Sequence, residues 1–419
     1  MSKFLIEGKN PLAGEIRVAG NKNAALPIIA ATVLTDEECV LENLPWIRDV
    51  EAMLALLQDL GKTVEHVAPG VVRIRGAITK FAPGQTLVRK LRASILYLGA
   101  LLARTGEAEI VPPGGCVIGR RGLEGHFEAL AALGARIEIR AHDYRAQLLA
   151  PHAAKIFLHE PSVTVTENAL LLAAAIAGES VIANAACEPH VTDLAQVLIK
   201  MGATIHGAGS NQLNIIGAQK LCGFTHRVMP DHIEAGTFAI AAACTHGHVL
   251  IHEAQQEHLQ MTALYMQRFG MRFEFKDEQT LEVLPSELHA PATKVQVGIW
   301  PGFPTDLMSP LIVLATQAQG TTLCHDWMYE SRMFFVDKLI AMGARITLCD
   351  PHRVLVSGPT ALRGQELSSP DIRAGIALVI AALAARGRSA IERAELVDRG
   401  YEDIVARLGR LGAKIMREE

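Results

Sequence analysis

The chain has 419 residues, of which half are hydrophobic, and its 40 Lys and Arg nearly balance its 44 Asp and Glu. This near-neutral charge, without basic runs, argues against a nucleic-acid-binding face, and no apolar run reaches the ~18 residues of a membrane-spanning helix. The seven cysteines form no CxxC pair, which argues against zinc spacings and a disulfide framework. We therefore expect a cytoplasmic protein without metal, cofactor, nucleic-acid partner or membrane partner, and we favour a monomer.

Residues 1–20 predict a pair of strands and contain no apolar segment typical of a signal peptide. Further along, a signature of an apolar residue, a glycine, a variable residue and a strand-like stretch recurs at intervals of 68 to 73 residues. Each glycine follows an amphipathic segment, as a glycine after a helix C-terminus does. We therefore predict amphipathic helices that end before Gly61, Gly134, Gly202, Gly270, Gly343 and Gly412.

Segments of mostly small, apolar residues recur with the same period, and each is followed by a short strand-like stretch. A helix that is apolar on every side is a buried helix. We predict buried helices within residues 23–34, 93–103, 168–178, 235–244, 308–318 and 374–385. The repeating unit is then strand, buried helix, strand, exposed helix and strand pair, or βαβαββ, and six copies account for the chain.

Repeats of this length can also form an open-ended solenoid, in which each copy contacts only its neighbours. Helices that are apolar on every side need cover on every side, however, and three copies that close around three buried helices provide it. We therefore predict an α/β fold with two domains of three copies each, which face each other across a cleft. A hinge is expected near Asp231.

The N-terminal ends of the predicted buried helices carry the unusual polar residues of these segments. Equivalent copies would point these ends the same way, where unpaired N–H groups and a partial positive charge attract anions. A single Asp or Thr at a helix start is also an ordinary N-cap, so the argument depends on the repetition. The polar residues are Lys22, Asn23, Arg92, Thr166, Glu167, Asn168, Asp231, Glu234, Thr305, Asp306, Asp371 and Arg373. With Arg121, Arg332 and Arg399 they predict a site for polyanionic ligands.

A cysteine stands in the glycine- and proline-rich stretch PPGGCVIGRR, residues 112–121. Two arginines follow it closely, and a thiol beside arginine ionises readily and becomes reactive. An idle loop thiol is the alternative interpretation of Cys116. We expect His126, which follows this stretch, to cap a helix or pack rather than take part in chemistry.

Several motifs occur in the order and at the distances found in one known family: GNKNAALP, RAS at Arg92, PGGCVIGRR, FPTD and DRGYE. By these motifs the chain resembles the enolpyruvyl transferases from end to end. The resemblance implies an inside-out α/β barrel in each domain. It also implies a first domain at residues 22–230 with the cysteine loop at 111–122, and a second at residues 1–21 plus 231–419. The active site is expected in the cleft between them.

The resemblance further implies transfer of the enolpyruvyl group of phosphoenolpyruvate to the 3-hydroxyl of UDP-N-acetylglucosamine by addition and elimination, with release of phosphate. This is the first committed step of peptidoglycan synthesis. Cys116 is implied as general acid and Asp306 as general base. The implied contacts of phosphoenolpyruvate are Lys22, Arg92, Arg121 and Arg399, of which Lys22 and Arg399 are also implied in catalysis. The other implied site residues are Asn23, Ser162, Val163, Thr164, Arg332, Asp371 and Arg373.

Three features depart from the pattern of the family. The segment PSVTVTEN, on the expected diphosphate side, lacks a glycine, His232 stands where arginine is common, and Glu124 stands where aspartate is frequent. A related enzyme that acts on another nucleotide acceptor therefore stays open, as does a catalytically silent nucleotide-binding homologue. The loop cysteine argues against shikimate 3-phosphate as acceptor.

Overall fold

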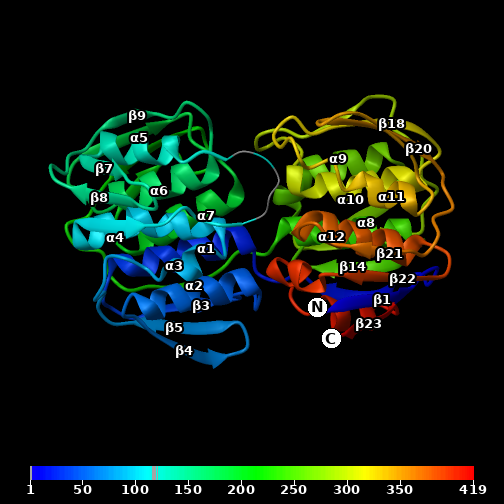
Figure 1. Ribbon diagram of the computed structural model, residues 1–419, viewed down its shortest axis with the longest axis horizontal. Helices are drawn as coiled ribbons and strands as arrows, with labels where there is room; N and C mark the ends of the chain where they lie inside the picture. Colours follow the sequence, from blue (N-terminus) through cyan, green and yellow to red (C-terminus); the bar gives the residue numbers. More distant parts are fainter. Residues whose placement is uncertain (1, 116–118, 120) are drawn as a thin grey trace. The chain divides into compact units, whose positions relative to one another are not determined.

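The computed structural model describes residues 2–115, 119 and 121–419 (Figure 1). The described residues form two compact units, which we call the N-terminal unit (residues 20–115 and 121–229) and the C-terminal unit (residues 2–19 and 230–419). Three sheets lie in each unit, counted over the described residues. The predicted α/β class and its threefold repetition are confirmed, whereas the domain limits expected from the sequence stay a prediction.

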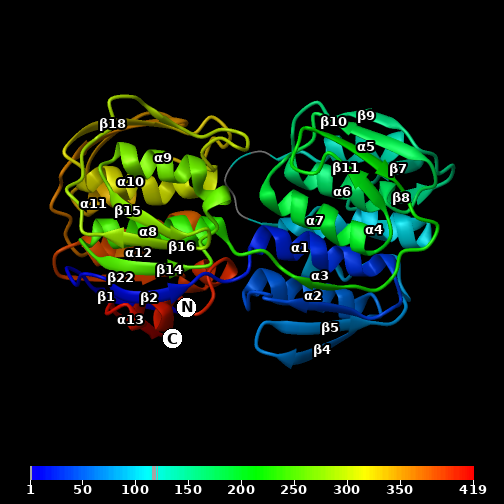
Figure 2. The same ribbon diagram turned by 180° about the vertical axis from the view of Figure 1, so that it is seen from behind.

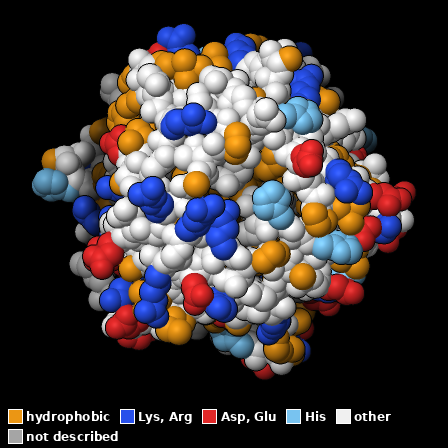
Figure 3. All heavy atoms as spheres, turned by 90° about the vertical axis from the view of Figure 1, so that its right-hand side faces the viewer, with side chains coloured by type: hydrophobic (Ala, Val, Ile, Leu, Met, Phe, Trp, Pro, Cys, Tyr) orange, Lys and Arg blue, Asp and Glu red, His pale blue; other side chains and the backbone are white. Residues whose placement is uncertain are grey.

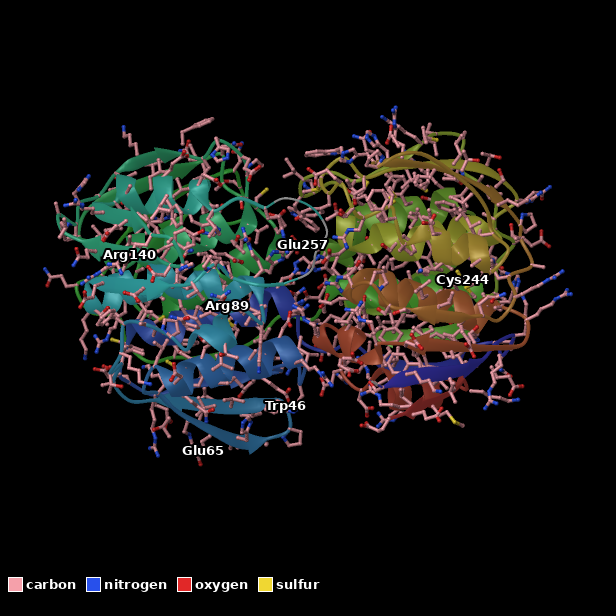
Figure 4. The ribbon with its side chains drawn as sticks, in the orientation of Figure 1. Trp46, Glu65, Arg89, Arg140, Cys244 and Glu257 are labelled. Carbon is pink, nitrogen blue, oxygen red and sulfur yellow. The ribbon has the colours of Figure 1, made fainter. Side chains whose placement is uncertain are left out.

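The predicted buried helices are all present, and strands surround them within each unit (Figures 1 and 2). In the C-terminal unit all three of these helices contact one another, and in the N-terminal unit α4 contacts both α1 and α6. Every residue of α8 and of α12 is buried, including Cys244 at the end of α8, labelled in Figure 4. The helices are α1 (Lys22–Ala31), α4 (Leu96–Thr105), α6 (Val163–Ala173), α8 (His232–Cys244), α10 (Met308–Gln317) and α12 (Ile372–Ala384).

The amphipathic helices end where the glycine signature predicts. Each of the six glycines has a positive φ, between 75° and 116°, a conformation in which a residue with a Cβ is strained. The chain therefore leaves each helix in the same way and enters the next strand. The helices are α2 (Arg48–Asp59), α5 (Glu124–Ala132), α7 (Pro189–Lys200), α9 (Gln260–Arg268), α11 (Val336–Ala341) and α13 (Ile404–Arg410).

The sheets of the N-terminal unit have the orders β13-β3-β5-β4, β6-β8-β7 and β11-β12-β10-β9. Their strands are β3 (Cys39–Glu42), β4 (Thr63–Ala68), β5 (Val71–Arg75), β6 (Glu107–Ile110), β7 (Ala135–Ile139), β8 (Tyr144–Leu148), β9 (Lys155–Phe157), β10 (Glu179–Ala183), β11 (Thr204–His206), β12 (Gln212–Ile216) and β13 (Thr225–Arg227).

The sheets of the C-terminal unit have the orders β15-β16-β14-β2, β17-β18-β20-β19 and β21-β22-β1-β23. Their strands are β1 (Lys3–Glu7), β2 (Ala13–Arg17), β14 (His248–His252), β15 (Arg272–Asp277), β16 (Thr280–Leu284), β17 (Val295–Gln296), β18 (Gly320–His325), β19 (Arg345–Asp350), β20 (Arg353–Gly358), β21 (Glu366–Ser368), β22 (Arg388–Glu392) and β23 (Lys414–Glu418).

Short elements complete the fold. They are α3 (Gln85–Val88) and the 3₁₀ turns η1 (Thr32–Leu34), η2 (Arg92–Ile95), η3 (Gln256–Leu259), η4 (Thr305–Leu307) and η5 (Ala394–Arg399). None of the helices in the described part of the chain combines the length and the apolar composition of a membrane span. Charged side chains of both signs are interspersed with scattered hydrophobic ones on the face in Figure 3.

The prediction that residues 1–20 form a pair of strands is wrong in one respect. Both strands, β1 and β2, are present, but they belong to different sheets. β1 lies between β22 and β23 and is antiparallel to both, so the start of the chain completes the sixth repeat. β2 pairs with β14 in parallel. The second repeat also departs from the pattern, since no strand precedes its buried helix and Phe81 O instead accepts from Glu109 N.

The close contact of α4 with α6 depends on Gly99. A Cβ at this position would lie 2.5 Å from Asn168 Oδ1 and 2.6 Å from Asn168 O. We expect Gly99→Ala to lower the free energy of unfolding by ~1–3 kcal/mol, since two packed helices would have to separate. Gly409→Ala, at an exposed position of α13 with nothing within 4 Å of the added Cβ, should raise the free energy of unfolding by ~0.5–1 kcal/mol. Urea denaturation measures both, and shifts in the same direction would contradict the assigned packing.

Candidate active site

Lys22 begins α1, directly after the N-cap Asn21, whose side chain accepts from Ala24 N. Its Nζ lies 2.8 Å from Asp49 Oδ2, and both side chains are largely buried. Asn23 follows it in the first turn and is half-buried. The predicted cation is therefore present at the helix start, and its charge is balanced by a carboxylate of α2 that the sequence analysis did not single out.

Arg92 and Arg121 are brought together beside the described part of the cysteine loop. Arg92 Nη2 donates to Arg121 O at 2.8 Å and to Gly122 O at 2.7 Å. A Cβ at Gly115 would lie 3.1 Å from Arg92 Cβ and 3.5 Å from Arg121 Nη2, so this glycine contacts both residues. Cys116 follows it directly but lies outside the described residues.

Only glycine fits at Gly114, one position earlier in the loop. A Cβ there would lie 1.7 Å from the carbonyl oxygen of Arg89, which Figure 4 labels. The backbone of the loop thus approaches the end of α3 more closely than any side chain would permit. Gly114 and Gly115 therefore allow the backbone to lie against the segment that carries Arg89 and Arg92.

α6 begins earlier than the sequence analysis expected. Its N-cap is Ser162, so Val163 and Thr164 form the first turn and are half-buried. Ser162 makes no side-chain cap, and the N–H groups of a first helical turn have no partner within the helix. The residues expected at the tip, Glu167 and Asn168 among them, are instead fully buried one turn further on.

Two carboxyl groups with buried oxygens lie near this helix: Glu167 in α6 and Glu188 at the start of α7. Glu167 Oε1 and Glu188 Oε2 are both inaccessible and have no hydrogen-bond partner within the described part of the chain. Burial raises the pKa of Glu167 well above its usual value, and the neighbouring Glu188 raises it further. Burial also raises the pKa of Glu188. Burial therefore favours the neutral carboxylic acid form of Glu167 over the anion.

In the C-terminal unit, Asp306 is bound by two guanidinium groups. Arg332 Nη2 lies 3.1 Å from Asp306 Oδ1, and Arg373 Nη2 lies 2.8 Å from Oδ2. The two arginine side chains are 2% and 6% exposed, whereas that of Asp306 is 25% exposed. Burial disfavours the charge of Arg373, but Asp306 and nearby oxygen groups outweigh it and raise its pKa. The carboxylate is thus fixed on both oxygens and still reachable.

Asp371 and Arg373 occupy the start of α12, as predicted. Asp371 is the N-cap and accepts from the N–H groups of Arg373 and Ala374 at 2.8 and 3.0 Å. Arg373 Nη1 donates to the buried Tyr401 hydroxyl at 3.1 Å. Arg399 ends η5, which packs against α12. Asp306, Arg332, Asp371 and Arg373 therefore form one connected cluster.

A family model describes this chain over most of its length. The model of EPSP synthase (3-phosphoshikimate 1-carboxyvinyltransferase) matches residues 6–408. The chain belongs to the EPSP synthase family.

Named relatives of the family match the chain from end to end. It is 46% identical to the UDP-N-acetylglucosamine 1-carboxyvinyltransferase of Treponema denticola over 100% of both chains. It is 47% identical to the protein of the same name from Bradyrhizobium diazoefficiens, over 99% of this chain and 98% of that one.

Solved structures of the family share the fold. The enolpyruvyl transferase NikO from Streptomyces tendae has a TM-score of 0.89 at 23% identity, covering 99% of this chain and 98% of that one. The EPSP synthase of Acinetobacter baumannii has a TM-score of 0.76 at 18% identity over 100% of both chains. At these identities both likenesses show that the fold is shared.

Asp326 is a polar residue of this family member that the sequence analysis missed. It is fully buried and accepts from the Thr305 hydroxyl and from the N–H groups of Met328 and Tyr329. Burial raises its pKa, while Thr305 and Arg332 act in the opposite direction. Asp326 thus fixes the turn that carries Asp306. The motif FPTD pointed to this turn, but no local pattern connects it to a residue twenty positions later.

Two residues near the start of α8, the predicted tip residue Glu234 and His232, have structural partners. Glu234 forms an ion pair with Arg407 and accepts from Ala19 N at 2.7 Å, which joins α8 to α13 and to the start of the chain. His232 packs against the rings of His258 and Trp300, and burial lowers its pKa to about 3, with further lowering by His258 and Arg373. His232 is therefore neutral and adds no cation where the family often has arginine.

The buried acid of α6 makes the stability of the protein dependent on pH. Because the pKa of Glu167 is raised on folding, the folded state holds a proton that the unfolded state releases above pH 4.5. Stability from this group is complete below that pH and declines by at most ~1.4 kcal/mol per pH unit as the pH rises through the folded pKa. We expect Glu167→Gln to remove this decline. The free energy of unfolding of the variant, measured by urea denaturation, should therefore rise relative to that of the wild type between pH 5 and pH 8.

A carboxyl group on the surface provides the control for this measurement. Glu179 is exposed in β10 of the same unit, and Glu179→Gln should follow the wild type at every pH. Parallel curves for Glu167→Gln and the wild type would show that Glu167 is ionised in the folded protein.

Proposed function

We propose that this protein transfers the enolpyruvyl group of phosphoenolpyruvate to the 3-hydroxyl of UDP-N-acetylglucosamine and releases phosphate. The observation on which this depends is full-length identity of 46% and 47% to two relatives named UDP-N-acetylglucosamine 1-carboxyvinyltransferase. The match extends over all the motifs in which the site residues lie.

The charges of the two units support a polyanionic pair of substrates. Lys22, Arg92 and Arg121 lie at the helix starts and loop of the N-terminal unit, and Arg332, Arg373 and Arg399 lie in the C-terminal unit. We propose that residues of both units act on the same bound substrates. A fixed cationic lining offsets the mutual repulsion of phosphate, carboxylate and diphosphate groups.

The reaction that we propose has two stages. The oxygen of the sugar hydroxyl adds to C2 of phosphoenolpyruvate, while Asp306 accepts its proton and Cys116 donates a proton to C3. The bond from C2 to the phosphate oxygen then breaks and C3 loses a proton, which restores the double bond and releases phosphate. The product is the enolpyruvyl ether of the sugar nucleotide.

The surroundings of Asp306 support its role as a base that is controlled by substrate. Two guanidinium groups stabilise the carboxylate and thereby weaken it as a base. Nε of Arg332 is buried without an acceptor within the described residues, so the fold leaves one hydrogen-bonding group of this guanidinium unpaired. An anion that draws a guanidinium toward itself would leave Asp306 more basic when the hydroxyl is in place.

This activity places the protein in peptidoglycan synthesis, and so in the control of cell shape, cell cycle and division. We propose a cytoplasmic location, since both substrates are water-soluble, and a monomer.

The absence of a glycine from residues 161–168 supports a second candidate, an enolpyruvyl transferase that acts on another nucleotide acceptor.

Phosphate release tests the activity directly. With phosphoenolpyruvate present, we expect UDP-N-acetylglucosamine to produce phosphate and one equivalent of the enolpyruvyl ether, detected by mass spectrometry. Other UDP-sugars and shikimate 3-phosphate should not. Faster turnover with another nucleotide would favour the second candidate, and binding of UDP-N-acetylglucosamine without phosphate release would identify a silent homologue.

Substitution of Cys116 tests the proposed proton donor. Cys116→Ala should lower kcat by about 10²-fold or more, which is the typical contribution of general acid catalysis. Cys116→Asp restores a proton donor and should retain turnover, while it abolishes labelling of the site by a thiol-alkylating epoxide. Undiminished kcat in Cys116→Ala would end the assignment of this thiol as general acid.

A further inference from the structure

The amide of Asn168, in the second turn of α6, has its orientation set by two backbone groups. Gly99 N donates to Asn168 Oδ1 at 2.9 Å, and Asn168 Nδ2 donates to Ile95 O at 3.0 Å. An N–H can only donate and a carbonyl oxygen can only accept, so the amide oxygen and nitrogen cannot be exchanged. The second hydrogen of Nδ2 is available to His126 Nδ1, which lies 2.9 Å away.

This contact decides which nitrogen of His126 carries the hydrogen. Because Nδ1 accepts from Asn168, the imidazole is neutral and protonated on Nε2. Burial lowers the pKa of His126 to about 3, and the charge of Arg92 lowers it in the same direction, so the ring stays neutral at physiological pH. His126 Nε2 therefore donates to Thr164 Oγ, 3.3 Å away.

The hydroxyl of Thr164 accepts this bond and keeps its own hydrogen for another acceptor. No second partner of Oγ is present within the described residues, and Thr164 is half-buried in the first turn of α6, where a ligand can reach it. The hydrogen bonds thus form a series in which each group donates to the next, from Gly99 through Asn168 and His126 to Thr164. The series starts at a buried backbone N–H and ends at an accessible hydroxyl.

We propose that Asn168 and His126 are positioning residues that hold the Thr164 hydroxyl as a hydrogen-bond donor to the diphosphate of the nucleotide acceptor. The inference rests on the proposed function and on the family resemblance, which implies that residues 162–164 lie on the diphosphate side of the UDP-sugar. The diphosphate of a UDP-sugar offers only acceptor oxygens at neutral pH, so a donor with a fixed direction favours it. The hydroxyl adds to the N–H groups of the first turn in a segment without glycine.

The first test removes the hydroxyl and keeps the shape. Thr164→Val should weaken binding of both UDP and UDP-N-acetylglucosamine in isothermal titration by about tenfold, the typical effect of a hydrogen bond to a charged group. KM for the sugar nucleotide should rise by the same factor, while kcat and KM for phosphoenolpyruvate stay within about twofold, as for loss of uniform binding.

Two further variants make this result specific. Thr164→Ser keeps the hydroxyl and should restore most of the lost affinity. Thr204→Val, an exposed threonine in β11 of the same unit, should leave every constant unchanged. Equal affinity of Thr164→Val and the wild type for UDP, or equal losses in Thr164→Val and Thr164→Ser, would overturn the proposal.

The second test reverses the direction of the series. At a pH at which the carboxyl group introduced by Asn168→Asp is ionised, it accepts from His126 Nδ1, so the neutral ring has its acceptor nitrogen toward Thr164 and draws the hydroxyl hydrogen inward. KM for UDP-N-acetylglucosamine should rise at high pH and recover at low pH, where the introduced carboxyl group takes up a proton, donates to Nδ1 as Asn168 does, and leaves Nε2 to donate to Thr164 again. The wild type should lack this titration.

Coupling between the two positions separates positioning from structural damage. If Asn168 acts through Thr164, Asn168→Asp should not raise KM further in a Thr164→Val background. An equal rise at every pH that persists in the double variant would show a structural role and overturn the proposal. Thermal unfolding checks each variant, and if Asn168→Asp does not fold, the Thr164→Val and Thr164→Ser pair decides the question.

The outcomes also separate this inference from the proposed function. A wild-type protein that releases no phosphate with any nucleotide acceptor would overturn the proposed function. An active wild type whose affinity for UDP is insensitive to Thr164→Val would overturn only the role of the hydrogen-bond series.

Discussion

The whole structure depends on the burial of helices that are apolar on every side. Such a helix is stable in water only when other elements cover it completely, and sheets and amphipathic helices provide that cover in each unit. Polar side chains are then few along these helices, and those that lie within them, such as Glu167 and Asn168 of α6, are buried. The first turn, with its unpaired N–H groups, is where polar chemistry can be placed without a large desolvation cost.

The polar groups at these ends fall into two kinds. Some are fully satisfied by the fold, as Glu234 is by Arg407 and Ala19 N, and these join elements together. Others are held by buried partners while part of the side chain stays exposed to solvent. Asp306 is held on both oxygens by buried arginines yet keeps a quarter of its side chain exposed. Anchoring of this kind limits the movement of a catalytic group, so little reorganisation is needed when charge develops on the substrate.

Buried hydrogen bonds give direction to groups that would otherwise rotate. A threonine hydroxyl can donate or accept with equal ease, and only its neighbours decide which it does. Around α6 the neighbours are an amide fixed by Gly99 and Ile95 and a histidine that is too deeply buried to take a second proton. Burial on the same helix favours the neutral form of Glu167, so the low dielectric of the packed interior disfavours the charged forms of both titratable side chains.

The amino-acid sequence by itself determined the repeating architecture. Apolar stretches such as 374–385 and glycines such as Gly134 are local signals, because burial of a whole helix and a positive φ after its last turn each restrict the residue type directly. The motifs at Lys22, Arg92, Asp306 and Arg399 likewise identified the candidate site, and the roles of these residues are part of the proposed function.

Only the tertiary structure decided which residues meet. Three contacts join positions that no sequence period connects. They are the pairing of β1 with β22 and β23, the ion pair of Lys22 with Asp49, and the hydrogen bond from Thr305 to Asp326 that supports the turn of Asp306. The register of α6 was also a tertiary result, since Thr166, Glu167 and Asn168 have polar side chains that read as a helix start but are buried in its second turn. Sequence patterns indicate the burial and backbone conformation that each residue favours. The partner that each residue contacts depends on how distant segments pack.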